Sequence, residues 1–126
     1  MKKMEDGEIS IYEYEGAGYE PTMHFESWRV AIANPCERFS EDKFERLERH
    51  RLTDEVFVLL FGQASLVIGK ELRYVTMEPG KIYNVKTGTW HNILLGNNAK
   101  VLIVENHNTN VENTEYYQFG KRGRHE

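Results

Sequence analysis

Residues 48–62 join a charged segment to a strongly apolar one. Residues 55–61, Glu-Val-Phe-Val-Leu-Leu-Phe, are rich in strand-forming side chains and apolar on both faces, which predicts a buried β-strand. Glu55 shares one face of this strand with Phe57, Leu59 and Phe61, because side chains alternate along a strand. A lone carboxylate on an apolar inward face is costly to bury, so Glu55 needs a partner. A metal ion held together with His50 is the simplest one.

Short segments with strand character recur along the rest of the chain, separated by turn residues. We expect strands at residues 9–14, 25–33, 45–51, 55–61, 64–68, 71–77, 82–85, 90–95, 100–105 and 115–119. Only residues 40–44 suggest a helical turn, with Ser40 as the N-cap. This pattern predicts an all-β fold, an antiparallel sandwich or barrel.

Length and composition are those of one domain, which we place at residues 1–126 with a core at about 9–119. We expect the charged ends, residues 1–7 and 120–126, to be disordered, and residues 106–115 to be an Asn-rich loop. A net charge of −4 with scattered basic residues gives no case for nucleic-acid binding. No apolar run is long enough for a membrane helix, and no signal peptide is evident. With a single cysteine, Cys36, these features predict a soluble, cytoplasmic protein.

A second polar segment, residues 77–92, places two turns around a short strand and ends at His91. The spacings His50-x4-Glu55-x6-Gly62 and Gly80-x5-Lys86-x-Gly88-x2-His91 resemble the two conserved motifs of the cupin superfamily. The chain is most similar to the small, single-domain bacterial cupins. The resemblance implies a double-stranded antiparallel β-barrel of jelly-roll type. Asp42, Lys86 and Leu95 depart from the motifs at peripheral positions, whereas Glu48 replaces a motif histidine.

His50, Glu55 and His91 are the predicted metal ligands. Two imidazoles and one carboxylate suit one divalent ion such as Mn, Fe, Zn or Ni, and the same set occurs in non-haem iron oxygenases. Each histidine alone would more often be a hydrogen-bonded core residue. The spacing of the three residues together favours a metal site.

Glu48 lies two residues before His50, so both point to the same face of a strand. It is a fourth ligand, a general base beside the metal, or an exposed residue paired with Arg46 or Arg49. The shared face favours the first two roles, and we take Glu48 as the candidate catalytic residue.

Several other residues have two interpretations. One of Tyr83 and Asn84 faces the cavity, or Tyr83 is core and Asn84 a turn residue. Arg29 binds a substrate carboxylate or is solvated. His24 and His107 are not expected to be ligands. The aromatic side chains expected in the core or cavity wall are Trp28, Phe57, Phe61 and Trp90, with Leu59, Ile93 and Leu95 as further apolar wall.

Three functions fit these expectations. The first is an enzyme of isomerase, lyase or oxygenase type that uses a divalent metal as a Lewis acid on a sugar or hydroxy acid. The second is a non-catalytic cupin that binds a small sugar or effector. The third is a metal-free cupin epimerase with a histidine base. We also expect a homodimer, in which residues 9–14 offer an exposed edge and Tyr12, Tyr14 and Tyr19 contribute to the contact.

Overall fold

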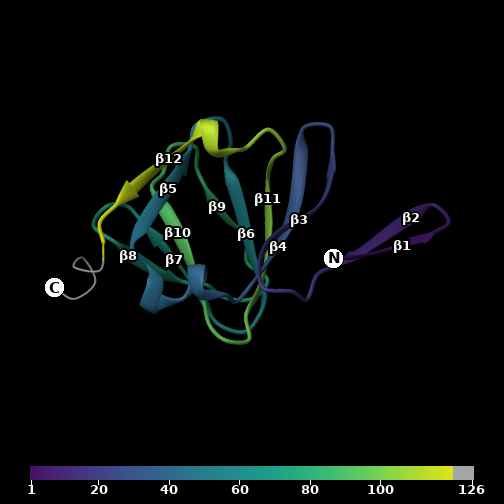
Figure 1. Cartoon of the computed structure of the whole chain (residues 1–126), viewed down its shortest axis with the longest axis horizontal. Coiled ribbons are helices and arrows are strands. Elements are labelled where there is room, and N and C mark those ends of the chain that lie inside the picture. Colours follow the sequence, from purple (N-terminus) through teal and green to yellow (C-terminus); the bar gives the residue numbers. More distant parts are fainter. Residues whose placement is uncertain (121–126) are drawn as a thin grey trace.

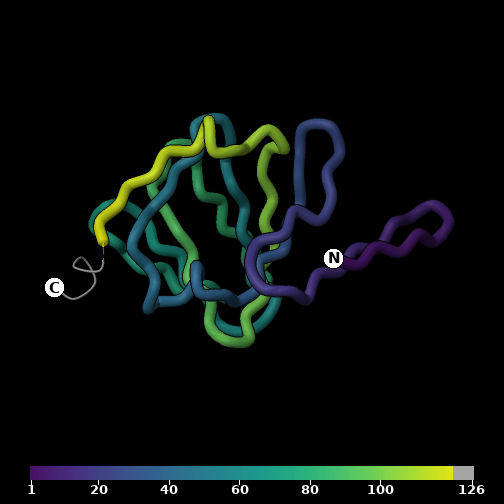
Figure 2. Tube along the Cα trace, in the orientation of Figure 1, coloured from purple at the N-terminus to yellow at the C-terminus, as the bar shows by residue number. Residues whose placement is uncertain are grey.

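Two antiparallel sheets face each other in the computed structural model, which describes residues 1–120 (Figure 1). The first sheet has the order β3 (Gly18–Phe25), β4 (Trp28–Asn34), β11 (Lys100–Asn106), β6 (Glu55–Phe61) and β9 (Tyr83–Val85). The second has the order β12 (Thr114–Gln118), β5 (Arg46–His50), β10 (His91–Leu95), β7 (Ala64–Ile68) and β8 (Arg73–Thr76). The two sheets enclose a barrel, which the chain trace in Figure 2 outlines. This confirms the predicted all-β, double-stranded antiparallel barrel.

The main core lies between the sheets and comes from alternate residues of their strands. On β6, Glu55, Phe57 and Leu59 are buried, and on β11 the buried residues are Val101, Ile103 and Glu105. Apolar side chains therefore fill most of the barrel. At one end of the buried face of each strand stands a carboxylate, Glu55 on β6 and Glu105 on β11. A smaller cluster covers the outer face of the second sheet, where Trp90 packs beside Phe44, Leu47, Val67 and Leu94.

Strand β3 differs from the expectation, because no strand was predicted between residues 14 and 25. Pro21 argues against a strand in sequence, since it cannot donate a hydrogen bond to a neighbouring strand. In the structure β3 is an edge strand, and its register with β4 shifts between Pro21 and Met23. A sheet tolerates proline on an edge strand and at an irregular register, and both apply to Pro21.

Two of the expected core aromatics, Trp28 and Phe61, are 43% and 53% exposed. On β4 the inward face is the one that carries Ala31 and Ala33, so Trp28 points outward. Phe61 lies beyond a register shift between β11 and β6, where it pairs with Lys100. Both predictions were therefore wrong, while Phe57 is buried in the core as expected.

Residues 1–7 were expected to be disordered, whereas Lys2–Asp6 forms β1 and pairs with β2 (Ile9–Glu13). Lys3 lies over the Tyr12 ring, and Ser10 donates a hydrogen bond to Glu5. This two-stranded hairpin projects from the barrel (Figure 1). The expected disorder at residues 121–126 lies outside the described residues.

The helical segments of residues 1–120 are three 3-10 turns: η1 (Glu37–Phe39), η2 (Glu41–Lys43) and η3 (Val111–Asn113). Ser40 precedes η2, as the sequence predicts, but its side chain makes no capping hydrogen bond. Within the described part of the chain, no helix is long and apolar enough to cross a membrane.

Candidate metal centre

His50, Glu55 and His91 meet inside one end of the barrel, as their spacing predicts. His50 ends β5, Glu55 begins β6 and His91 begins β10, so the group bridges the two sheets. The Nε2 atoms of both histidines lie 2.9 Å from the same Glu55 oxygen, Oε1. The three residues are 3–7% exposed. Two imidazoles therefore converge on one buried carboxylate oxygen.

Turn contacts hold the two motif segments together. The Gly88 N–H donates to the carbonyl of His50, at a positive φ of 82° that favours glycine. Asp54 accepts hydrogen bonds from the backbone N–H and hydroxyl of Thr87 and from the Asn84 amide. These contacts fix the turn before His91 against the corner after His50, which explains how residues distant in sequence reach a common position.

The hydrogen bonds of His91 define its tautomer. Its Nδ1 lies 2.9 Å from the Thr89 carbonyl oxygen, which only accepts, so Nδ1 carries a proton. In neutral His91 the Nε2 lone pair then faces Glu55 Oε1, another acceptor. Without an ion, this short contact requires a second proton on His91 or a proton on Glu55. A metal cation would occupy the same position between two lone pairs.

His50 is oriented by a side chain rather than by a carbonyl. Its Nδ1 lies 3.0 Å from the Thr114 hydroxyl, which can donate or accept. Ligating histidines in metalloproteins commonly bond through their other ring nitrogen in this way. Both imidazoles therefore have the outer hydrogen bond typical of metal ligands.

Charge interactions within the cluster are strong. Burial alone would lower the pKa of His50 and His91, but the Glu55 carboxylate outweighs it and raises both pKa values. Burial would raise the pKa of Glu55, but its hydrogen bonds to the two imidazoles lower it. In the absence of an ion, the cluster thus favours imidazolium beside carboxylate.

Glu105 is a further carboxylate in the cavity that the sequence interpretation missed. It is 6% exposed and lies on β11. Its Oε2 accepts hydrogen bonds from the Tyr19 hydroxyl, at 2.7 Å, and from Arg29, at 3.0 Å. Burial and the nearby Glu55 raise the pKa of Glu105, against the lowering effect of Tyr19 and Arg29. Inward-facing positions on β11 are Val101, Ile103 and Glu105, just as those on β6 are Glu55, Phe57 and Leu59. This alternation was the sequence signal that could have identified Glu105.

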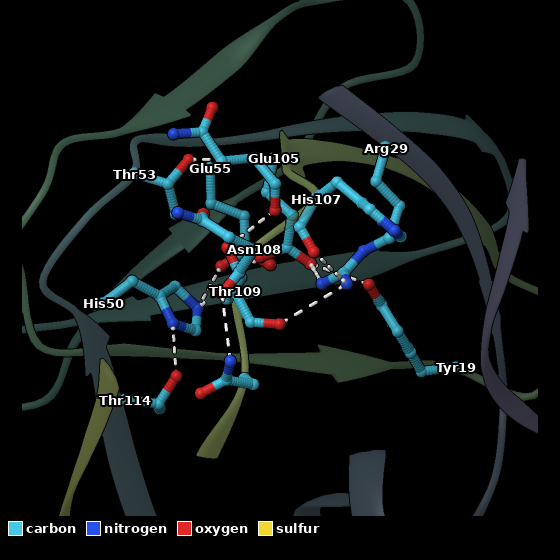
Figure 3. Close-up of polar contacts among 12 residues, drawn as sticks. Tyr19, Arg29, His50, Thr53, Glu55, Glu105, His107, Asn108, Thr109 and Thr114 are labelled. Carbon is cyan, nitrogen blue, oxygen red and sulfur yellow. Dashed lines mark hydrogen bonds and ion pairs between the residues drawn. The ribbon is translucent and has the colours of Figure 1, made fainter. Parts of the chain in front are cut away.

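Arg29 and Tyr19 consequently have roles different from those considered. Arg29 is not solvated, because it pairs with Glu105 and with the carbonyls of His107 and Thr109, but it also lines the cavity. Tyr19 belongs to the cavity rather than to a surface cluster with Tyr12 and Tyr14. Figure 3 shows Arg29 and Tyr19 on one side of the carboxylates and His50 on the other.

Glu48 lies at the cavity wall with its side chain 17% exposed, 3.9 Å from Arg38. One of its carboxylate oxygens is within 4.8 Å of a ligand atom of His50 and of His91. The structure therefore does not place Glu48 on the solvent face with Arg46 or Arg49. It stands beside His50 and His91, and its side chain is more exposed than those of the three predicted ligands.

A cavity of about 200 Å³ opens beside this group. Phe57, Ile93 and Ile103 supply apolar wall, while Leu59 and Leu95 belong to the core and do not line it. The Asn-rich loop after β11 contributes Thr109, Asn110 and Val111 to the lining, so it has a place at the site that composition alone did not suggest. Further lining residues are Arg38, Phe39, Asn92 and Tyr116.

The other candidates lie outside the cluster. Tyr83 packs against the core and Asn84 bonds to Asp54, so neither lines the cavity. His24 and His107 stack on each other at 3.7 Å on the surface.

Comparison with known proteins supports the fold. No protein-family model and no curated protein matches the sequence. A structure of a Streptomyces PAC13 variant with uridine is 14% identical, covers 87% of each chain and has a TM-score of 0.63. An RmlC-like cupin with a double-stranded β-helix fold from Methanocaldococcus jannaschii is 12% identical, covers 76% of this chain and 88% of its own, and has a TM-score of 0.58.

FeII HppE is also similar, at 16% identity and a TM-score of 0.55, over 71% of this chain and 50% of that one. These identities establish similarity of fold alone. The chain therefore has the cupin fold, with a buried cluster of histidine and glutamate at one end of its barrel.

Proposed function

We propose that this protein is a metal-dependent cupin enzyme acting on a small polar metabolite, with His50, Glu55 and His91 as ligands of one divalent ion. The main support for a bound ion is the tautomer of His91. Its Nδ1 proton bonds to Thr89, so in neutral His91 the Nε2 lone pair faces the Glu55 oxygen, a position that a proton or a metal cation satisfies. Imidazole nitrogen and carboxylate oxygen suit Mn(II), Fe(II), Zn(II) or Ni(II).

The bound ion would supply Lewis-acid polarisation of a carbonyl, hydroxyl or carboxylate group of the substrate. Glu48 stands beside the ligands on the cavity wall and is the group that would accept or return the substrate proton. Arg38, 3.9 Å away, would help to hold the Glu48 carboxylate in position. Phe57 and Ile93 would exclude water on the apolar side of the cavity.

Cavity size and lining support a small, polar substrate. The volume of about 200 Å³ lies below the about 300–1,000 Å³ of pockets for drug-sized ligands. The lining side chains of Arg38, Asn92 and Asn110 offer hydrogen bonds suited to hydroxyl or carboxylate groups. A sugar or hydroxy acid fits these properties. PAC13, which has the same fold, has been seen with uridine, a ligand that contains a sugar.

A substrate screen tests the proposal. Protein purified without chelators or a nickel column is loaded with one metal at a time and incubated with sugars, hydroxy acids and nucleosides, with and without oxygen. Metal-dependent conversion of one class is the expected result. Ligands that bind without conversion would instead indicate the non-catalytic cupin. Conversion that is unchanged after metal removal would indicate the metal-free, epimerase-type alternative.

A further inference from the structure

Glu105 comes from neither motif segment, yet it is buried beside Glu55. Val104 of β11 pairs with Val56 of β6, and continuing this antiparallel register sets Glu105 against Glu55. Ligand atoms of His50, Glu55 and Glu105 all lie within 4.8 Å of one another. Like charges on directly opposite residues destabilise a sheet. Two adjoining buried carboxylates therefore require a compensating positive charge.

The two oxygens of Glu105 have different surroundings. Oε2 is fully engaged by Tyr19 and Arg29. Oε1 is buried and has no hydrogen-bond partner, although it lies 3.9 Å from His50 Nε2. A buried carboxylate oxygen without a partner is costly. The position of Oε1 among the predicted ligands indicates that a bound cation is its missing partner.

Arg29 and Tyr19 fix the direction of the free oxygen. The carbonyls of His107 and Thr109 hold Arg29, which in turn holds Oε2 of Glu105 (Figure 3). Groups that orient a metal-binding carboxylate through its other oxygen commonly accompany metal sites. If Glu55 and Glu105 are both ionised, Arg29 balances one of their two negative charges, and an imidazolium or a bound cation balances the other.

We propose that Glu105 Oε1 is a further ligand of the metal ion, so that two histidines and two glutamates, His50, His91, Glu55 and Glu105, form the protein's ligand set. This rests on the proposed metal centre and deepens it. The hard oxygens of two carboxylates favour Mn(II) or Fe(II) over copper. Glu48 is then left free of the ion for proton transfer.

Calorimetric titration with Zn(II) alone tests this ligand set. The wild type is compared with Glu105→Gln, with Tyr19→Phe and with Glu115→Gln, a matched change at an exposed carboxylate that pairs with Arg49. Tyr19→Phe is expected to weaken Zn(II) binding about tenfold, as for groups that only orient a ligand. Glu105→Gln is expected to weaken it by more than about a hundredfold, beyond the range of such groups. Glu115→Gln should leave it unchanged.

The outcomes separate this inference from the metal centre itself. If the wild type binds no Zn(II), both fail. If the wild type binds Zn(II) and folded Glu105→Gln binds it equally well, only the role of Glu105 is overturned. If Glu105→Gln does not fold, a crystal structure of the wild type with Zn(II) decides. Oε1 within about 2.2 Å of the ion supports the proposal, and Oε1 beyond coordination distance overturns it.

Discussion

Glu48 and His91 occupy directly opposite positions on the antiparallel strands β5 and β10. Opposite residues on one face have Cβ atoms about 5 Å apart, which brings the Glu48 carboxylate beside a predicted metal ligand. Strand β5 also carries His50, two residues after Glu48. Glu48 therefore brings a carboxylate, in place of a motif histidine, beside His50 and His91.

Glu48→Gln should retain the metal and lose turnover by about two orders of magnitude or more, since the amide cannot accept the substrate proton. Metal content and kcat of the purified variant are the measurements. Glu45→Gln, a change on the same segment outside the cavity lining, serves as control. Loss of metal as well as turnover would make Glu48 a ligand. No change in either would refute the proposed role.

Metal-free protein should lose stability as the pH rises above about 6.5, the unperturbed histidine pKa. The raised pKa values of His50 and His91 mean that their stabilising contribution is complete below that pH and is lost as the pH rises through the folded-state values. The lowered pKa of Glu55 acts oppositely, and its contribution is complete above about pH 4.5 and is lost as the pH falls. The cluster therefore contributes most between these limits.

Thermal melts with and without Zn(II) across this range check the pH dependence. The increase in Tm caused by Zn(II) should grow with pH, because the ion replaces a proton on the imidazoles. His91→Gln should reduce the pH dependence above about pH 6.5 without abolishing it, because His50 keeps its contact with Glu55. A metal-induced shift that stays constant with pH would contradict this account.

Thr114→Val tests the outer hydrogen bond of His50. The hydroxyl lies 3.0 Å from Nδ1 and valine keeps nearly the same shape. Loss of this partner should weaken Zn(II) binding about tenfold to a hundredfold, because the ring is no longer oriented. Thr76→Val, on β8 and outside the cavity lining, is the control. Equal Zn(II) affinity of wild type and Thr114→Val in calorimetry would show that His50 needs no such support.

The convergence of His50, Glu55 and His91 could be predicted from sequence because strand alternation and motif spacing are local patterns. His50, Glu55 and His91 each stand at the end of a strand whose apolar residues are evident in sequence. The Glu105 network could not be predicted in this way. It joins Tyr19, Arg29 and Glu105 from three strands, and nothing in their separate segments indicates that they meet.

The misplaced elements have equally physical causes. A strand containing Pro21 is recognisable only once its edge position is known. The outward position of Trp28 follows from the small Ala31 and Ala33 on the opposite, inward face, and hydrophobicity alone favours the reverse orientation. Local sequence thus indicated where most strands lie, while the orientation of β4 depended on its neighbours.

A homodimer is expected from the projecting hairpin. Met4 and Ile11 are cross-strand partners, and with Ile9 they form an apolar face that is 43–57% exposed. A two-stranded hairpin is marginally stable alone, so packing of this face against a second copy would stabilise it. Light scattering at micromolar concentration should give twice the chain mass of 14.8 kDa, and Ile11→Lys should halve the result. A monomeric wild type would contradict the expectation.

The metal content of wild type and His91→Ala, measured after purification without chelators or a nickel column, tests the central claim most directly. His91 contributes Nε2 to the buried Glu55 oxygen, so its loss removes one of the proposed ligands. We expect about one divalent ion per wild-type chain and none bound stoichiometrically to the variant, with a lower Tm for the variant. Wild-type protein that binds no Mn(II), Fe(II), Ni(II) or Zn(II), even when each is added, would contradict it.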